Sequence, residues 1–481
     1  MFANSKSIQI KKDILIRIVE AFFSDDFENN VNKIPVEMRP KHFEVPYRCC
    51  IHKERAIIRD RIISYLGFAM EKDDEIESLK DYATDALNRN QPDEKPLTVL
   101  EDACKGCVPS QIYVTDLCKG CVARPCEMVC QFGAVSVKDG RSQIDGTKCV
   151  GCKKCMSACP YNAIVKLAVP CEDACPVGAI AKNEQGLAVI NYDDCISCGK
   201  CVESCPFGAV HEKSQIIDVL KYIKDKNVKV VAMFAPAIAG QFQGNIKQFE
   251  TAILKAGFDD VYEVASGADI TTKTEAKEFE ERIAKNEPFM TTSCCAGYNE
   301  LIKKHLTELK PYVSTTKTPL YYTAEIVRKT YPDAKLVFIS PCVAKRKEVH
   351  DNPNIDYVMN SEELGAIFIG RKIEITACEE REIENPPSKQ GRNYAITGGV
   401  ADAVKHAMNH PEIMKPYIIN GLNKDEIKKL KNFARNKSCP DCNIIEVMCC
   451  KGGCIGGNAT INPETNSKKN IEELLKDSKD L

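Results

Sequence analysis

The distribution of cysteine constrains this chain more than any other feature. The 481 residues include 27 cysteines, and sixteen of them lie within residues 96–212, among short segments punctuated by glycine and proline. Disulfide scaffolds this rich in cysteine are short secreted chains with signal peptides, and the first twenty residues read instead as an amphipathic helix. In a reducing compartment the cysteines stay thiolates, and closely spaced thiolates indicate metal. We therefore expect a cytoplasmic metalloprotein.

The overall charge excludes several classes of partner. Lysine and arginine number 66 against 68 acidic residues, which gives a net charge of −2. Such a balance provides no general attraction to nucleic acid or to an anionic membrane. The longest apolar run, residues 230–240, has 11 residues and contains a proline, so it is too short to span a bilayer. We expect no nucleic-acid partner and no membrane insertion.

Two stretches of the chain repeat the spacing C-x2-C-x2-C-x3-C-P, at residues 149–160 and 195–206. This is the bacterial ferredoxin signature, in which three close thiolates bind one 4Fe-4S cube and the fourth binds the neighbouring cluster. Three sulfurs that reach three corners of one cube require a tight loop. Zinc sites close with four ligands at other spacings, so zinc or free thiols are the disfavoured alternative.

The remaining cysteines of this region complete two modules, one inside the other. A looser run at residues 118–130 pairs with the run at 149–159, and the orphan pairs at 104–107 and 171–175 join as one split motif around that module. The alternative leaves the pair at 104–107 as spare thiols and gives three clusters. With crossed fourth ligands, four 4Fe-4S clusters are expected, held by Cys118, Cys121, Cys126 and Cys159; by Cys149, Cys152, Cys155 and Cys130; by Cys104, Cys107, Cys171 and Cys205; and by Cys195, Cys198, Cys201 and Cys175.

The patterns of hydrophobic residues predict a multidomain α+β protein. Residues 1–95 show helical periodicity and are expected to form a helical N-terminal domain. Residues 96–212 are expected to form nested bacterial-ferredoxin-like domains, an inner module (115–165) inserted in an outer one (100–114 plus 166–212). Strand and helix runs alternate over residues 213–481, which predicts an α/β domain. The charged tail from residue 467 is expected to be a solvated helix. Four redox centres in series imply a redox-active site at their inner end.

Three cysteine-bearing segments in the C-terminal domain carry a family resemblance: TSCCAGY at 292–298, SPCVAKRKE at 340–348 and EVMCCKGGCIGG at 446–457. Their order, with a C-x3-C in the third, resembles the signature loops of the FeFe hydrogenase large domain over residues 228–460. Tyr298 and the segment YRCCIHKERA at 47–56 resemble the lineage often called group B. The C-terminal domain is thus expected to be a hydrogenase-like, H-cluster-binding catalytic domain.

The resemblance implies an H-cluster and its ligands. Cys454 would bridge to a two-iron subcluster that carries CO, cyanide and an azadithiolate bridge. An ammonium group is the natural partner for a cyanide nitrogen, and Lys345 matches the lysine with that role. Met448 matches a methionine that packs beside the two irons. The fifth cube would bind Cys295, Cys342, Cys450 and Cys454, and the loop around the other cyanide would be Ala235, Pro236 and Ala237.

The resemblance also implies a proton relay. Cys294 matches the thiol that passes protons to the bridging amine, Ser314 matches a relay hydroxyl, and Glu275 and Glu278 match two relay glutamates. The two glutamates and Arg282 are spaced i, i+3, i+7, which places them on one face of a helix. Carboxyl, hydroxyl and thiol groups each accept and donate protons. Without the match, the glutamates would be read as a solvated helix face.

The sequence also departs from the family pattern. Alanine stands at 237 where many relatives have serine, at 296 where proline is usual, and serine stands at 340 where methionine is usual. Tyr298 replaces a tryptophan, and Asn458 ends a shortened glycine run. These changes alter the polarity around the two-iron unit but remove no ligand. Cys439-x2-Cys442 suggests a redox or zinc role, although a single pair is a weak signal.

The resemblance implies an anaerobic hydrogenase that interconverts protons and H2. Electrons would pass through the 4Fe-4S clusters to or from ferredoxin or a similar carrier, and maturation proteins would supply the two-iron unit. The alternatives are a hydrogenase-like iron–sulfur protein without that unit, active in iron–sulfur assembly or in redox or H2 sensing. Relatives of the assembly type tend to lose the lysine and the relay residues, so Lys345, Cys294, Glu275 and Glu278 favour the enzyme.

Overall fold

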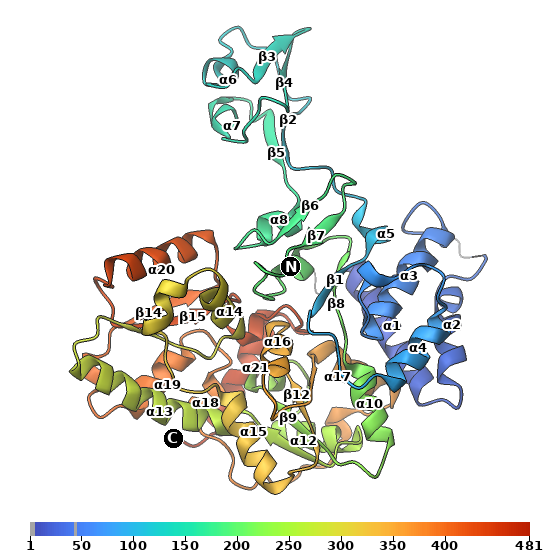
Figure 1. Ribbon diagram of the computed structural model, residues 1–481, viewed down its shortest axis with the longest axis vertical. Helices are drawn as coiled ribbons and strands as arrows, with labels where there is room; N and C mark the ends of the chain where they lie inside the picture. The colour runs from blue at the N-terminus through green and yellow to red at the C-terminus, as the bar shows by residue number, and fades with distance from the viewer. Residues whose placement is uncertain (1–4, 43–45) are drawn as a thin grey trace.

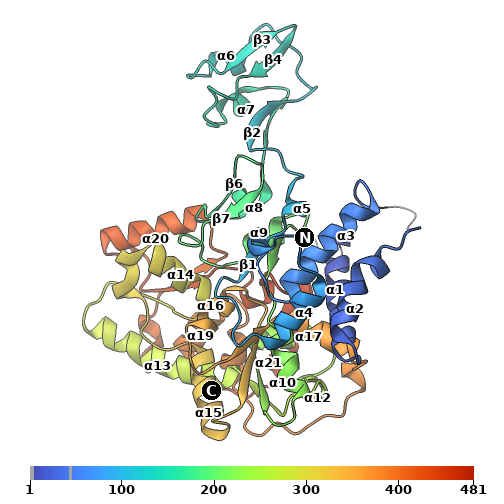
Figure 2. The same cartoon turned by 45° about the vertical axis from the view of Figure 1, so that its right-hand side comes forward.

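The computed structural model describes residues 5–42 and 46–481. Residues 1–4 and 43–45, which belong to the stretch expected to be helical, lie outside this description. Figures 1 and 2 show a broad body, built from the N-terminal helices and the C-terminal domain, from which a narrow arm projects. Within the described ranges, no helix is both long and apolar enough to cross a membrane.

The described residues of the N-terminal part form four α-helices, as predicted. On α1 the residues Ile14, Ile18 and Phe22 recur at helical spacing and are buried, which gives the helix one apolar face. This face packs on the neighbouring helices and on α17 of the C-terminal domain, so the two parts share one continuous core. The helices are α1 (Lys6–Phe22), α2 (Phe27–Met38), α3 (Ile51–Tyr65) and α4 (Leu79–Asn88).

In the structure the cysteine-rich region consists of an outer module, which begins at β1, and an inner module over residues 111–167 inserted within it. In the outer module, β1 pairs with β8 and β6 with β7, all antiparallel. Each short helix of this module contains or adjoins a cysteine. The elements are β1 (Leu97–Val99), α5 (Glu101–Cys104), α8 (Pro170–Ala174), β6 (Ile180–Lys182), β7 (Ala188–Ile190), α9 (Lys200–Ser204) and β8 (Val210–Glu212).

The inner module forms the projecting arm of Figures 1 and 2. Its strands β2 and β5 pair antiparallel, with Gln111 opposite Leu167, so the chain enters and leaves the arm at the same place. A small core of its own includes Val114, Val135 and Ile164. The elements are β2 (Gln111–Val114), α6 (Pro125–Met128), β3 (Val135–Lys138), β4 (Arg141–Ile144), α7 (Lys154–Ala158) and β5 (Ile164–Leu167).

Two parallel sheets organise the C-terminal domain. One has the strand order β10-β9-β12-β13 and the other β11-β15-β14. The central strands β9 and β15 are buried along their whole length, which is typical of parallel strands covered on both faces. The strands are β9 (Val230–Phe234), β10 (Asp260–Glu263), β11 (Met290–Thr291), β12 (Lys335–Ile339), β13 (Tyr357–Met359), β14 (Pro416–Asn420) and β15 (Ile444–Met448).

The helices of this domain cover the sheets and confirm the predicted alternation. They are α10 (Ile216–Lys224), α11 (Pro236–Ala239), α12 (Ile246–Lys255), α13 (Ala265–Ala284), α14 (Ala296–Lys304), α15 (Pro319–Thr330), α16 (Ala344–His350), α17 (Ser361–Gly370), α18 (Lys389–Asn393), α19 (Gly399–Ala407), α20 (Lys424–Asn436) and α21 (Glu464–Lys476). The fold class predicted from the sequence is thus confirmed.

The expectation of a solvated C-terminal helix is wrong in one respect. Helix α21 forms, but Ile471 and Leu475 lie one turn apart and are buried against a cluster that includes Ala237 and Ile455. Gln241 donates from Nε2 to the hydroxyl of Ser467 at 3.0 Å. The tail therefore supports the loop that follows β9, because its sparse apolar residues fall on one helical face.

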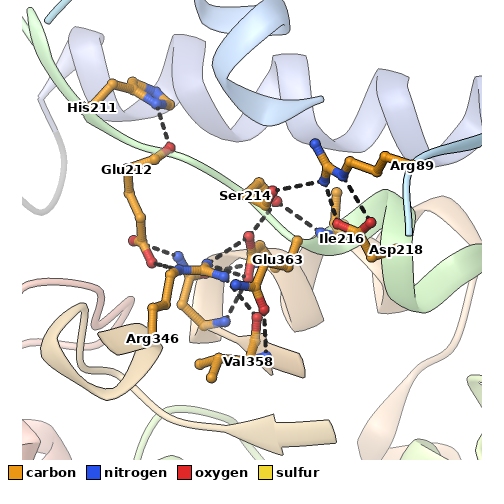
Figure 3. Close-up of polar contacts among 11 residues, drawn as sticks. Arg89, His211, Glu212, Ser214, Ile216, Asp218, Arg346, Val358 and Glu363 are labelled. Carbon is orange, nitrogen blue, oxygen red and sulfur yellow. Dashed lines mark hydrogen bonds and ion pairs between the residues drawn. The ribbon is translucent and has the colours of Figure 1, made fainter. Parts of the chain in front are cut away.

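A buried ion network joins the three parts of the protein (Figure 3). Arg346, on α16, forms ion pairs with Glu212 at the end of β8 and with Glu363 on α17, the latter at 2.9 Å. Arg346 is 3% exposed and also donates to the carbonyl of Val358 at 2.7 Å. Beside it, Arg89 follows α4 and pairs with Asp218 on α10. The network fixes α16 relative to the ferredoxin-like region.

Replacing Arg346 by methionine should destabilise the protein strongly. Glu212 and Glu363 would lose their cation, and breaking a buried pair costs about 3–5 kcal/mol. Urea unfolding of the anaerobic protein, followed by circular dichroism, measures the loss. Arg17→Met is the matched control, because Arg17 pairs with Asp13 at the surface and should contribute less than about 1 kcal/mol. Equal effects of the two changes would contradict the role of the network.

Candidate functional site

The structure gathers three of the four predicted cysteine sets around separate cavities. Each cavity is lined by all four members of one set, and the sets come from segments far apart in the chain. In the outer module, for example, Cys104 and Cys107 meet Cys171 and Cys205. The other two cavities are lined by Cys118, Cys121, Cys126 and Cys159, and by Cys175, Cys195, Cys198 and Cys201.

The fourth set lies in the core of the arm. Cys155 is buried in this core, Cys130 and Cys149 are partly buried and pack against the core, and Cys152 is exposed. No group of three or more His, Cys, Asp or Glu in the described ranges is arranged to hold a single metal ion. A 4Fe-4S cube instead takes one thiolate at each iron corner, so its ligands surround a cavity.

A repeated hydrogen bond indicates that these cysteines are prepared to act as thiolates. The backbone N–H four residues after the last cysteine of a run donates to its sulfur, as in Ala134 to Cys130 at 3.4 Å and Ala179 to Cys175 at 3.2 Å. Cys205 receives the same bond, at 3.3 Å from Ala209. Such bonds stabilise the negative charge on sulfur and tune the potential of a bound cluster.

The C-terminal domain contains a buried cavity of about 90 Å³ at the carboxyl ends of strands from both sheets. Open parallel sheets bind ligands at this edge. Strand β9 leads into Ala235, β12 into Ser340 and β15 into Cys449, so that loops remote in sequence converge here. The sequence-predicted residues in the lining are Ala235, Pro236, Ala237, Cys294, Cys295, Cys342, Lys345, Met448, Cys450 and Cys454.

The four cysteines expected to hold the fifth cube share this cavity. A hydrogen bond from the thiol of Cys449 lowers the pKa of Cys295 to about 6, whereas burial raises the pKa values of the other three thiols. Gly453 has φ of +89°, and a Cβ at this position would lie 2.6 Å from the backbone nitrogen of Thr397. Only glycine fits there, so the loop can bring Cys450 and Cys454 to one side of the cavity. The donor set fits an iron–sulfur cofactor.

Lys345 is the one charged side chain among the described residues that line the cavity. Its ammonium group pairs with Glu348 one turn along α16 and lies 3.5 Å from the carbonyl oxygen of Cys294. Burial lowers the pKa of Lys345, but Glu348 and the nearby cysteines raise it by more, so the ammonium stays charged. A fixed cation in an apolar cavity suits an anionic ligand.

The four predicted relay residues lie in one region behind the cavity. Glu275 and Glu278 share a face of α13, and the hydroxyl of Ser314 donates to Glu278 Oε2 at 2.8 Å. Glu275 is 1% exposed, and neither of its carboxylate oxygens has a hydrogen-bond partner among the described residues. Burial raises the pKa of Cys294, in the cavity wall, and the charges of Cys295 and Glu275 nearby raise it further.

The two glutamates have opposite protonation preferences. Burial raises the pKa of Glu275 to about 8. Burial also acts on Glu278, but hydrogen bonds from Thr315, Thr316 and Ser314 outweigh it and lower the pKa of Glu278 to about 2. At neutral pH the inner carboxyl therefore holds a proton while the outer one is ionised. Two carboxyl groups whose pKa values differ in this way can act as an acid–base pair.

Two further side chains of the cavity, those of Tyr394 and Cys449, were not among the predicted site residues. Tyr394, 6% exposed, lines it, and its hydroxyl shares a hydrogen bond of 2.9 Å with Thr272 on α13. In the sequence Tyr394 precedes a glycine-rich turn and belongs to no motif, so its position in the cavity could not be predicted. Cys449 lies beside Cys295, and a Cβ on Gly297 would lie 3.0 Å from its sulfur. The sequence did offer one indication for Cys449, because it directly precedes the predicted ligand Cys450.

Other cysteines lie away from these sites. Cys439 and Cys442 form a disulfide at the end of the loop after α20, so the redox alternative for this pair has structural support, whereas no third ligand for zinc adjoins it among the described residues. Cys49 and Cys50 precede α3, and Cys49 is exposed.

Comparison with known proteins identifies the family. Residues 228–458 match the family described as "Iron only hydrogenase large subunit, C-terminal domain", and residues 142–165 and 188–211 match the 4Fe-4S binding domain. The periplasmic Fe hydrogenase large subunit of Nitratidesulfovibrio vulgaris is 30% identical over 383 residues, which cover 67% of this chain and 86% of that protein. The chain belongs to the iron-only hydrogenase large-subunit family.

Other relatives show the breadth of this family. Iron hydrogenase 1 of Clostridium pasteurianum is 27% identical over 398 residues, 69% of this chain and 67% of that protein. A probable cytosolic Fe-S cluster assembly factor of Drosophila melanogaster is 23% identical over 281 residues, 47% of this chain and 58% of that protein. This iron-only hydrogenase family member thus has 4Fe-4S binding domains, and its own residues must distinguish catalysis from assembly.

Proposed function

We propose that this chain is an FeFe hydrogenase that catalyses the reversible reduction of protons to H2. One observation carries the proposal: a single cavity joins Cys295, Cys342, Cys450 and Cys454 to Lys345 and to a thiol backed by an acid–base pair. A redox site that handles protons needs both a cluster scaffold and a proton route, and this cavity supplies the two together.

The residues around the cavity support binding of the H-cluster that the family implies. The four cysteines would hold its 4Fe-4S cube, and Cys454 would bridge to the two-iron subcluster with its CO, cyanide and azadithiolate ligands. Lys345 would donate to one cyanide, the loop from Ala235 to Ala237 would surround the other, and Met448 would pack beside the irons. When bound, this group supplies the redox and H2-binding chemistry.

The chain's own residues would move the protons. Glu278, 14% exposed at its side chain, accepts from Ser314 and faces outward beside Arg282. Glu275 lies inward of this pair and, protonated at neutral pH, can deliver a proton toward Cys294 in the cavity wall. Ser314 also lies near enough to Glu275 to lower its pKa, so its hydroxyl would pass a proton from one carboxyl to the other, since a hydroxyl donates and accepts at once. The apolar lining excludes water from the rest of the cavity.

The cysteine sets would carry the electrons to or from a ferredoxin or similar carrier. Cys198 lines both the cavity of its own set and the C-terminal cavity, so the two predicted clusters would be neighbours. The sets in the arm would extend the path outward to the protein surface. The family thus implies carriers and H2 as partners, and the two-iron unit requires maturation proteins.

The alternative function is iron–sulfur assembly or sensing without the two-iron unit, and the similarity to an assembly factor favours it. Infrared spectroscopy of protein matured anaerobically with its maturation proteins separates the two. We expect CO and cyanide bands and roughly 22 iron atoms per chain, from five cubes plus two irons. Protein that contains the five cubes but shows no such bands would contradict the hydrogenase proposal and support the alternative.

A further inference from the structure

The arm carries an unusual share of exposed apolar side chains. It comprises residues 111–167, about an eighth of the chain, yet it holds seven of the fifteen large hydrophobic residues that are exposed in the described ranges. Exposed apolar groups gathered in this way mark interaction sites. They are Tyr113, Leu117, Val122, Met128, Phe132, Val150 and Tyr161, which we call the arm surface.

These side chains adjoin the predicted cluster ligands. Val122 directly follows Cys121 and is 98% exposed, and Val150 directly follows Cys149 and is 60% exposed. Met128, 83% exposed, is the last residue of the helix α6 and lies between the predicted ligands Cys126 and Cys130. A cluster bound inside the ligand loops cannot cover a side chain that points fully into solvent. Part of the arm surface therefore lies in the loops that carry the predicted cluster ligands.

The charge of the arm differs in sign from that of the whole chain. Residues 111–167 contain eight lysines and arginines against four acidic residues, a net charge of +4, whereas the whole chain carries −2. Lys119, Lys153 and Lys154 are exposed, lie within the cluster loops, and form no ion pair among the described residues. These cations therefore lie in the same ligand loops as Val122 and Val150 and would attract an acidic partner.

We propose that the arm surface is the docking site of a small acidic electron-carrier protein. The inference rests on the proposed function, which requires such a partner, and specifies where and how it binds. At each encounter the reduced carrier loses one electron, the arm cluster nearest the contact gains it, and no proton moves. Exposed apolar side chains interleaved with lysines in the same loops suit a partner that must bind quickly and leave again.

Binding to the fully loaded chain tests the docking site directly. The probe is an oxidised acidic 2[4Fe-4S] ferredoxin, with calorimetry for affinity and stopped-flow absorbance for electron transfer from its reduced form. Reversing the charge of two of these lysines in the double variant Lys153→Glu, Lys154→Glu should slow association about tenfold or more at low salt. The difference should shrink at high salt, because exposed charges are screened.

The apolar part is tested with Met128→Glu, which should weaken binding at all salt concentrations. Ile76→Glu and Lys277→Glu are the matched controls, because Ile76 is 86% exposed outside the arm and the Lys277 side chain is 79% exposed on α13. Iron content must be equal in all variants. Unchanged affinity and rate in the arm variants, or equal losses in the controls, would overturn the proposal, as would binding of the arm to a second copy of this chain in its place.

A measurement of H2 formation with reduced methyl viologen as the electron donor distinguishes failure of the docking proposal from failure of the proposed hydrogenase function. The dye reaches the clusters without docking, so the arm variants should retain the full rate with it. Loss of ferredoxin binding with normal viologen activity supports the docking site. Absence of viologen activity in the unmodified chain, with ferredoxin binding intact, would refute the hydrogenase function and leave the docking site standing.

Discussion

Replacing Glu275 by glutamine should lower the rate of H2 formation roughly a hundredfold or more, which is the usual range for losing a positioned acid–base group. Glutamine has nearly the same shape and fits the same buried site, but it cannot exchange a proton between Ser314 and Cys294. The carboxyl is 1% exposed, and no other titratable side chain takes part in the proposed relay between Glu278 and the cavity wall. Electron uptake by the clusters should be unaffected.

The measurement is H2 evolution with reduced methyl viologen, combined with a spectroscopic count of reduced clusters. Glu281→Gln on the same helix is the matched control, because that side chain is 56% exposed and should change the rate little. A normal rate in the Glu275 variant would rule out the proposed relay. Equal losses in both variants would point to damage to α13 instead.

The pH dependence of stability shows whether the Glu275 variant remains folded. The pKa of Glu275 rises from 4.5 to about 8 on folding because the carboxyl is buried. Between these values the unfolded chain has released a proton that the folded chain still holds, so this residue lowers stability as pH rises. Glu275→Gln removes the effect. The variant should therefore gain stability over the unmodified protein between pH 4.5 and 8, a trend that urea unfolding at several pH values can detect.

Replacing Cys454 by alanine should abolish H2 formation altogether. This cysteine is the proposed bridge between the cube and the two irons, and no other thiol in the cavity is assigned to that place. The CO and cyanide bands should disappear, and iron should fall from roughly 22 toward about 16 per chain as the whole H-cluster is lost. The four accessory clusters should keep their paramagnetic signals on reduction.

Cys378→Ser is the matched control for this change. Cys378 is buried, its sulfur donates only to the backbone carbonyl of Glu374 at 3.4 Å, and it lies in none of the described cysteine sets. Its replacement should leave iron content and infrared bands unchanged. Retention of both bands and activity in the Cys454 variant would refute the ligand assignment.

Much of the fold and of the candidate site could be predicted from the sequence because cysteine spacing is a strong local constraint. The split pair Cys104 and Cys107 could be assigned to Cys171 and Cys205 by the counting of motifs alone, and the structure brings these four residues around one cavity. The strands were equally readable, since buried parallel strands form short apolar runs. The signature loops follow the carboxyl ends of strands from both sheets and meet at one cavity.

What the sequence could not show depends on contacts between distant segments. Arg346 reads as one more basic residue in a charged helix, and only the fold brings Glu212 and Glu363 to it. The tail helix has few apolar residues, so its burial against Ala237 could not be inferred from composition. Tyr394 lines the cavity, but the turn that carries it contains no recognisable sequence motif. In each case the decisive partner lies at least seventeen residues away.

The pairing of Gln111 with Leu167 has a consequence for how such proteins diversify. The two ends of the arm lie one strand spacing apart, about 5 Å, so the whole module can be gained or lost without moving the chain on either side. The arm, and with it the length of the electron-transfer path, can thus change independently of the rest of the chain. A lineage could lengthen it, shorten it or adapt it to a new carrier while the catalytic domain stays under separate selection.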